Sequence, residues 1–281
     1  MSVTASERNA IRNKVERTTS VMTIPHVVSR VTALVDSRLA TASEIADELS
    51  GDPILVAKVL KLVNSGFYGF RQPVSTITRA TVLLGQDVIK TLVLSASVLA
   101  VMDKMNSLME GLWEHSVATA RLAALLAERT NVGKPEEIAL SGLLHDVGKV
   151  VIAQAFRLSH QKIRALVEQR NCLLIEAEHE ILGVGHPEVG LWLLSRWSLP
   201  EALVSPIAYH SSFHPARDFA DRTAVVHVAD ILARAKGLGN PGDRRVPRIH
   251  PEAWKMLGLT MEQVADVYRE QEHSTFLRAS A

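Results

Sequence analysis

Hydrophobic residues recur three and four positions apart along most of this 281-residue chain. That spacing places them on one face of an α-helix, whereas the alternation typical of half-buried strands is scarce. In the first hundred residues the pattern predicts helices over residues 25–37, 43–49, 54–63, 76–84 and 87–102. Asp52 followed by Pro53 is a typical start signal, an N-cap acid and a proline at the first helical position. We therefore expect an N-terminal helical bundle.

The helical spacing continues through the second half of the chain. It predicts helices over residues 112–129, 135–156, 159–169, 174–182, 187–197, 200–209 and 221–235. A loop rich in Gly and Pro follows over residues 236–251, and residues 252–276 are predicted to form a terminal helical pair. No long flexible linker separates the halves. We expect an all-α fold in two parts, residues 1–106 and residues 107–281, that pack on each other.

Composition and charge narrow the class of protein. The apolar fraction of 47% is ample for a buried core, and 31 basic residues nearly cancel 30 acidic ones. No large net field steers the chain toward nucleic acid or an anionic membrane, so we expect neither as a partner. The single cysteine, Cys172, cannot form an internal disulfide, which favours a reducing cytoplasm. The least polar run, residues 91–102, is too short to cross a bilayer.

Six histidine and aspartate side chains are candidates for chemistry. They are His115, His145, Asp146, His186, His210 and Asp230. Neutral imidazole and ionised carboxylate are ligands that Zn, Fe and Mn accept, and such a set can hold two ions if one carboxylate bridges them. Any one of these histidines by itself is more often an imidazole with a structural hydrogen bond. Asp230 lies among apolar neighbours, where a carboxylate requires a hydrogen-bond donor or a cation.

The order and setting of His115, His145-Asp146 and Asp230 resemble the ligand pattern of the HD superfamily of metal-dependent phosphohydrolases. From about residue 21 to residue 235 the chain looks like the HDOD family, the HD-related output domains of bacterial signalling proteins. The N-terminal part of this resemblance is carried by Ile24-Pro25, Asp52-Pro53, Val59 to Ser65, Phe67-Tyr68-Gly69, Ser75-Thr76-Ile77 and Leu83-Leu84-Gly85.

The resemblance implies roles for the six candidates. His115, His145, Asp146 and Asp230 would bind one ion, and His186 and His210 would add the ligands of a second. Asp146 would bridge both ions. Lys149 matches the lysine that offsets phosphate charge in cyclic-dinucleotide phosphodiesterases, which makes Asp146 and Lys149 the candidate catalytic pair. A solvated helix lysine is an equally good interpretation of Lys149.

The chain also departs from the phosphodiesterase branch. That branch carries two adjacent histidines and a Gly-Tyr-Pro signature, whereas His210 is followed by Ser211 and no Gly-Tyr-Pro occurs. A third ion and that particular activity are therefore not expected. His214 precedes Pro215, which disfavours helical geometry, so we predict a loop histidine there.

Two functions remain open at this point. HDOD proteins are mainly regulatory, so the first hypothesis is a cytoplasmic signalling module that binds a partner protein or a small nucleotide. The alternative is a metal-dependent phosphohydrolase that acts on a cyclic nucleotide or another phosphoester. Either would hold divalent transition metal, with two ions of Fe, Mn or Zn expected first and Ni or Mg as further options. A helical scaffold without metal is the third possibility.

Other polar residues have simpler interpretations. His227, three residues before Asp230, is either a residue that orients a ligand or the donor of a core hydrogen bond. Glu176, Glu178 and Glu180 are interpreted as the solvent-facing side of an acidic helix. Arg244, Arg245 and Arg248 are interpreted as a solvated patch in a flexible loop rather than as phosphate ligands.

Overall fold

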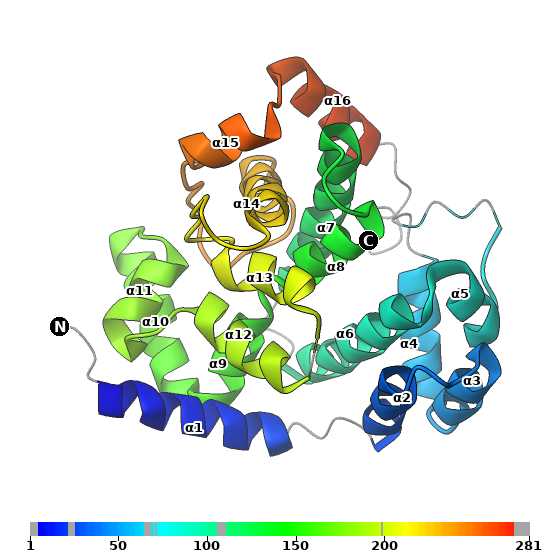
Figure 1. Ribbon diagram of the computed structural model, residues 1–281. Helices are drawn as coiled ribbons and strands as arrows, with labels where there is room; N and C mark the ends of the chain where they lie inside the picture. The colour runs from blue at the N-terminus through cyan, green and yellow to red at the C-terminus, as the bar shows by residue number, and fades with distance from the viewer. Residues whose placement is uncertain are drawn as a thin grey trace. The chain divides into compact units, whose positions relative to one another are not determined.

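The computed structural model describes residues 5–21, 26–64, 68, 70, 72–105, 111–197 and 199–272. Over these residues the chain consists of helices joined by turns and loops, with no strand, as Figure 1 shows. The predicted all-α class is confirmed. Residues Ile24, Pro25, Ser65, Phe67 and Gly69, which contribute to the family resemblance, lie outside the described residues.

The chain forms two compact units. Unit 1 comprises Met1–Val21 and Met105–Tyr268, and unit 2 comprises Met22–Lys104 and Arg269–Ala281. The helices of unit 2 are α2 (His26–Asp36), α3 (Ala42–Ser50), α4 (Pro53–Val63), α5 (Ile77–Leu84) and α6 (Gln86–Met105). Unit 1 contains α1 (Ala5–Val21), α7 (Leu112–Thr130), α8 (Pro135–Leu144), α9 (Val147–Ala155), α10 (Arg157–Arg170), α11 (Leu174–Leu182), α12 (His186–Arg196), α13 (Glu201–Tyr209), α14 (Ala220–Ala235) and α15 (Pro251–Leu257), together with α16 (Met261–Glu272) as far as Tyr268.

Side-chain caps fix the helix boundaries of unit 2. Thr41 and Glu44 form a capping box at α3, in which the Thr41 side chain accepts from the Glu44 amide and Glu44 accepts from the Thr41 amide. Asp52 caps α4 ahead of Pro53, as predicted. After α4, the Asn64 side chain donates to the Val74 carbonyl at 2.8 Å and accepts from the Val74 amide at 2.6 Å. Asn64 therefore joins the end of α4 to the segment that leads into α5.

The helix α1 is a finding that the sequence did not predict. Residues 5–17 are polar and mixed in charge, but Val15 is fully buried because α1 packs against α9 and α12. Arg8 forms an ion pair with Glu188, and Arg196 donates to the Glu16 carbonyl at 3.1 Å. Unit 1 therefore includes α1, although the expected division placed α1 in the N-terminal part, residues 1–106.

The prediction of one helix over residues 135–156 is wrong. The helical path breaks at His145 and Asp146, which form a turn between α8 and α9. A side chain at the end of one helix and a side chain at the start of the next can turn toward a common point, which neighbours inside one straight helix cannot do.

By length and composition, Pro135–Ala155 could cross a membrane, but 89% of the qualifying window is buried inside the protein. A buried core segment passes the same test, so this is weak evidence for a membrane span. A cytoplasmic location stays a prediction.

The core of unit 1 lies where α7 and α14 pack together. Leu122, Leu126, Val225 and Ala229 are fully buried there, and α15 and α16 add Ala253 and Val267. The helices α8 and α13 pack against this pair. Rigid, buried helices of this kind can hold polar side chains in a fixed geometry.

Candidate metal centre

The structure brings the six predicted ligands together in unit 1. His115 lies on α7, His145 follows α8, Asp146 precedes α9, His186 begins α12, His210 follows α13 and Asp230 lies on α14. Their ligand atoms form three groups, each within 4.8 Å: His115, His145 and Asp146; His145, His210 and Asp230; and Asp146, His186 and His210. All six residues are buried. Their role as metal ligands stays a prediction, but their convergence is observed.

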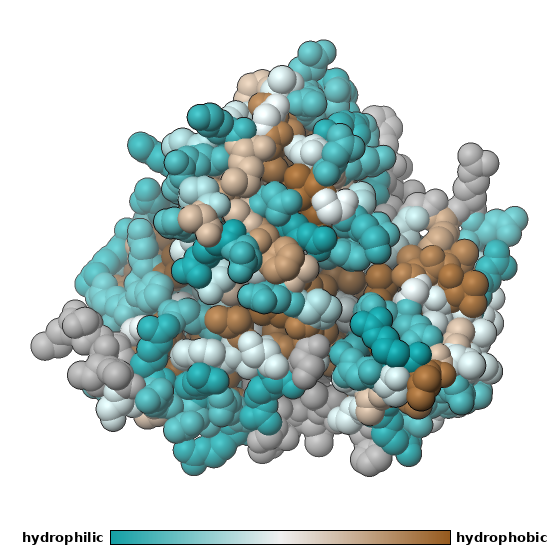
Figure 2. Space-filling model, in the orientation of Figure 1, coloured by the Kyte–Doolittle hydropathy of each residue, from teal (hydrophilic) through white to brown (hydrophobic). Residues whose placement is uncertain are grey.

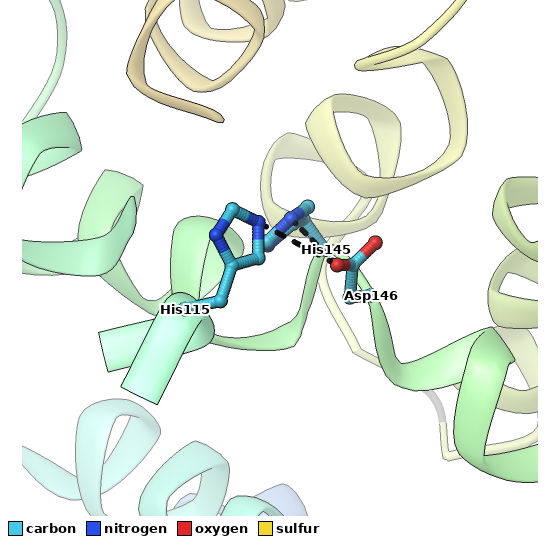
Figure 3. Close-up of side chains that lie close together, drawn as sticks. All are labelled: His115, His145 and Asp146. Atoms are coloured by element: carbon cyan, nitrogen blue, oxygen red, sulfur yellow. Dashed lines mark ion pairs between the residues drawn. The ribbon is translucent and has the colours of Figure 1, made fainter. Parts of the chain in front are cut away.

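Asp146 lies between the histidines. Its Oδ2 is 3.2 Å from His145 Nε2 and 3.7 Å from His115 Nε2, the two ion pairs dashed in Figure 3. Its other oxygen, Oδ1, is 3.3 Å from His186 Nε2. One carboxylate oxygen therefore faces His115 and His145 while the other faces His186, which is the arrangement that a bridging carboxylate requires.

Asp230 approaches the centre from α14. Its Oδ1 lies 3.0 Å from His115 Nε2 and 3.7 Å from His145 Nε2. His210 completes the cluster, with ring centroids 5.0 Å from His145 and 5.5 Å from His186.

The histidine rings present the same nitrogen to the centre. In each of the four, Nδ1 donates to an oxygen behind the ring: Leu238 O for His115, Gly142 O for His145, Glu178 Oε2 for His186 and Ile207 O for His210, at 2.7–3.2 Å. Because Nδ1 holds the proton, a neutral ring turns the Nε2 lone pair inward. Such outer hydrogen bonds are usual behind metal-ligating histidines.

Three inward atoms have no hydrogen-bond partner among the described residues. They are His145 Nε2, Asp146 Oδ1 and His186 Nε2. Their neighbours lie close enough but lack hydrogen-bond alignment. A buried polar atom without a partner costs about 1–3 kcal/mol, and three in one cluster are unusual in a stable core. Imidazole nitrogens and carboxylate oxygens on both sides of Asp146 are ligands of divalent cations, so the donor set suits a metal.

The ionisation of the centre follows from its burial. Burial lowers the pKa of His145, but the carboxylates of Asp146 and Asp230 outweigh it and raise that pKa to about 9. Burial raises the pKa of Asp146, yet His145 and Lys149 hold it well below its usual range. Without an ion, His145 therefore keeps a proton at neutral pH, which places a positive charge where a metal would otherwise supply one.

Two more of the four central histidines, His115 and His210, have a lowered pKa. Burial lowers the pKa of His115, against the opposing effect of Asp230. Burial also lowers the pKa of His210 well below its usual value, and the nearby His145 and His186 add to the effect. Neutral imidazole is the form that binds metal, so both rings are ready to act as ligands.

A close backbone contact sets the distance between Asp146 and His186. A Cβ built on Gly148 would lie 1.9 Å from the His186 carbonyl oxygen, so only glycine lets α9 approach α12 this closely. The contact places the start of α12 beside the start of α9.

Lys149 is buried at the centre. Its Nζ donates to Asp146 Oδ2 at 2.6 Å and to the Pro241 carbonyl at 2.8 Å. The interpretation of Lys149 as a solvated lysine is therefore wrong. Its ammonium offsets the charge of the proposed bridging carboxylate.

The sequence interpretation missed Glu178. Glu176 and Glu180 are exposed as expected, but Glu178 is 2% exposed and accepts from His186 Nδ1 at 2.7 Å and from the His186 amide at 2.8 Å. Its assignment to the solvent-facing side was wrong, because α11 turns this residue inward.

Arg234 and Asp243 were not singled out either. Arg234 Nε donates to Asp230 Oδ1 at 3.0 Å, and its Nη1 donates to Asp243 Oδ2 at 3.2 Å. Burial raises the pKa of Asp230, but Arg234 and His115 hold it well below its usual range.

The second interpretation of His227, as the donor of a core hydrogen bond, is confirmed. His227 contacts the chain around His210 rather than Asp230: its Nδ1 donates to the His210 carbonyl at 2.6 Å, and its Nε2 accepts from the His250 amide at 2.9 Å. His214 lies in an exposed loop, and Arg244, Arg245 and Arg248 are exposed.

A family model for the HDOD domain matches residues 21–213 of this chain. The chain belongs to the HDOD family. The resemblance in the sequence is thereby confirmed. Among curated relatives, an uncharacterized protein of Treponema pallidum is 26% identical to the HDOD chain over 223 residues, 78% of the chain and 43% of the relative. Ribonuclease Y of Aquifex aeolicus is 30% identical over 132 residues, 47% of the chain and 17% of that protein. The HDOD chain thus spans less than half the length of both relatives.

Solved structures share the fold of the HDOD chain. An HDOD domain protein with unknown function from Geobacter sulfurreducens has a TM-score of 0.68 at 27% identity, covering 95% of this chain and 96% of its own. A "Putative phosphohydrolase" from Shewanella amazonensis has a TM-score of 0.67 at 21% identity, with 92% and 93% covered. A "Putative signal transduction protein" from Marinobacter aquaeolei has a TM-score of 0.68 at 21% identity, with 95% and 64% covered. At 21% identity the likeness shows a common fold only.

Proposed function

We propose that the centre binds two divalent transition-metal ions, bridged by Asp146, and that the protein is a signal-transduction module whose state depends on them. The observation that carries the metal is the set of three buried, inward-facing ligand atoms of His145, Asp146 and His186 that lack a hydrogen-bond partner among the described residues. His115, His145 and Asp230 would share one ion with Asp146, and His186 and His210 would hold the other. The ligand chemistry favours Fe, Mn or Zn.

The signalling role requires a surface for a partner, and unit 2 offers a candidate. Ile54 on α4 is 71% exposed and Val82 on α5 is 74% exposed, and Figure 2 shows hydrophobic side chains gathered over α5. The helices α4 and α5 carry Lys58, Lys61 and Arg79 but no acidic residue. Exposed apolar groups beside basic ones favour a protein partner with acidic and apolar side chains.

The metal proposal is tested by the ion content and ion affinity of the full chain. We expect protein purified without chelators to retain Fe, Mn or Zn, and Asp146→Ala to lose it, because both ions would share that carboxylate. Asp218→Ala, which changes an exposed aspartate, is the matched control. A wild-type chain that binds none of these ions when they are added back would contradict the metal proposal and favour a helical scaffold without metal.

The partner surface needs a separate experiment. We expect Val82→Glu, which places a charge on the exposed face of α5, to abolish capture of a partner that the wild-type chain retains. Metal content should stay unchanged. Equal capture of the partner by the wild-type and Val82→Glu chains would contradict a role for this surface in partner binding.

A second candidate function is phosphoester hydrolysis, which Lys149 favours. When bound, paired ions polarise a phosphoryl oxygen and lower the pKa of a water. Lys149, buried beside Asp146, would add a positive charge close to a bound phosphate. The relative named Ribonuclease Y and the structural neighbour named a phosphohydrolase support testing phosphodiesters.

A panel of cyclic nucleotides, short RNA and simple phosphoesters tests this function with the metal-loaded chain. We expect any hydrolysis to fall at least about 100-fold in Asp146→Ala, consistent with loss of metal-assisted chemistry. Hydrolysis that survives this substitution would come from elsewhere.

A further inference from the structure

The segment Leu238–His250, here named the strap, lies directly against the start of α7. Gly239 has φ +70°, and a Cβ on it would lie 2.2 Å from the His115 amide nitrogen, so glycine is required on both counts. The Asn240 amide donates to the Gly111 carbonyl at 2.8 Å. The strap is therefore fixed beside the first ligand histidine, with no room for another residue between them.

Two backbone carbonyls of the strap face the centre. Leu238 O accepts from His115 Nδ1 at 3.2 Å, so it holds the ring with Nε2 inward. Pro241 O accepts from Lys149 Nζ at 2.8 Å, and the same ammonium donates to Asp146. One end of the strap is thus connected to two ligands, one directly and one through Lys149.

The middle of the strap is connected to a third ligand, Asp230, through the ion pairs of Arg234. Asp243 is 7% exposed, and its carboxylate lies 3.2–3.3 Å from Arg234 Nη1, while Arg234 Nε donates to Asp230. The Asp243 carboxylate also accepts from the backbone amides of Leu174 at 3.0 Å and Arg245 at 2.9 Å. Asp243 therefore ties the strap to α11 and to α14 at one point.

The far end of the strap connects to a fourth ligand. The His250 amide donates to His227 Nε2 at 2.9 Å, and His227 Nδ1 donates to the His210 carbonyl at 2.6 Å. Four of the six ligands are therefore reached from the strap, either directly or through one residue.

We propose that the strap positions the ligands of the metal centre and that Asp243 is the positioning residue on which this depends. The inference rests on the proposed metal binding. Arg234 lies between two aspartates, and Asp243 shares its positive charge. Without Asp243, the whole guanidinium charge would act on Asp230 and compete with an ion for that carboxylate. The strap would also lose its attachment to Leu174.

Metal binding and strap order are coupled by this arrangement. An ion that fixes His115, Asp146, Asp230 and His210 fixes the partners of the strap, so it stabilises the strap as well. By linkage, a loosened strap weakens metal binding to the same extent.

The first test measures Mn²⁺ binding to the full chain by calorimetry. We expect Asp243→Asn to weaken binding about 10-fold and Asp243→Ala up to about 100-fold, the range found when outer partners of metal ligands are removed. Asp218→Asn, an exposed aspartate outside the strap, should bind like the wild type. Wild-type affinity in both Asp243 variants would overturn the inference while leaving metal binding itself intact.

The second test needs no variant. Hydrogen exchange at the amides of Asn240 and His250 should slow at least about 10-fold when Mn²⁺ is added to wild-type protein, because both amides donate to partners beside the ligands. Unchanged exchange in a chain that binds Mn²⁺ would overturn the coupling. A wild-type chain that does not bind Mn²⁺ at all would overturn the proposed function and this inference together.

Discussion

Each histidine of the centre is held by a hydrogen bond on the side of the ring that faces away from the other ligands. Three of these acceptors are backbone carbonyls, but His186 depends on the carboxylate of Glu178. A carboxylate is a stronger acceptor than a carbonyl, and it makes the ring it binds more basic and a better ligand. Among the four acceptors behind the rings, Glu178 is therefore the one that a side-chain substitution can change, because the others are backbone carbonyls.

We predict that Glu178→Gln weakens metal binding about 10-fold, because a neutral amide orients His186 without raising its basicity. Metal titration of the full chain measures the effect. Glu180→Gln is the control on the same helix, since Glu180 is exposed and forms a surface ion pair with Arg170 at 2.8 Å. Equal losses in both variants would mean that Glu178 acts only through the net charge of α11.

The sequence contains a pattern that predicts the burial of Glu178, although its acidic neighbours suggest an exposed face. Glu178 is four residues from both Leu174 and Leu182, so a helix places it on their buried face. The convergence of the six candidate ligands could be predicted because the family resemblance assigned them by position. The ion pair of Arg234 with Asp230 has a local signal, because the two residues lie four apart on α14. The pairing of Arg234 with Asp243 has none, since it depends on the path of the strap.

At the scale of helices, the centre depends on pairs that approach closely. The contact of α9 with α12 occurs at Gly148, beside the backbone of His186. Gly190 lies in the same pair of helices but has room, with the nearest atom 3.5 Å from a built Cβ. The two glycines form a matched pair for mutation.

Gly148→Ala should lower the free energy of unfolding by about 3 kcal/mol, because the new methyl group must push the α12 backbone away. Gly190→Ala should be neutral or stabilise by up to about 1 kcal/mol through its helix propensity. Urea denaturation of the two variants gives both values. Similar stabilities for the two would show that α9 and α12 separate freely.

Most helices could be predicted from hydrophobic spacing, but two features could not. Apolar residues recur at helical spacing on both sides of His145 and Asp146 in residues 135–156, so the spacing alone hides the turn there. The polar composition of α1 gave no sign of burial, because only a narrow face around Val15 packs against α9 and α12. In both cases tertiary contacts override the local pattern.

For the molecule as a whole, the buried charges of the centre make stability depend on pH. In the metal-free protein the pKa of His145 is raised from 6.5 to about 9. A group whose pKa is raised on folding stabilises the folded protein fully at any pH below its unfolded-state pKa. That stabilisation is lost as the pH rises through the folded-state pKa. The pKa values of His115 and His210 are lowered on folding, which has the opposite effect on stability. The folded protein therefore loses stability as the pH falls below about 6.5.

Metal-free protein should therefore be most stable near pH 6.5 and lose about 3 kcal/mol between there and pH 9, the equivalent of the His145 shift. Thermal or urea denaturation across this range measures the loss. Metal-loaded protein should not show it, because a bound ion would hold His145 neutral at every pH in the range. The same alkaline loss with and without metal would contradict the assignment of His145 as a ligand.

The position of α1 has a consequence for synthesis of the chain. Its partners α9 and α12 are synthesised later, because the ribosome must add residues 22–146 before it reaches α9 and residues 22–185 before it reaches α12. At about 5–20 residues per second this takes on the order of ten seconds, long enough for the intervening helices of unit 2 to fold first. The helix α1 therefore leaves the ribosome before the helices that bury it, and until they follow, the side chain of Val15 is available to chaperones.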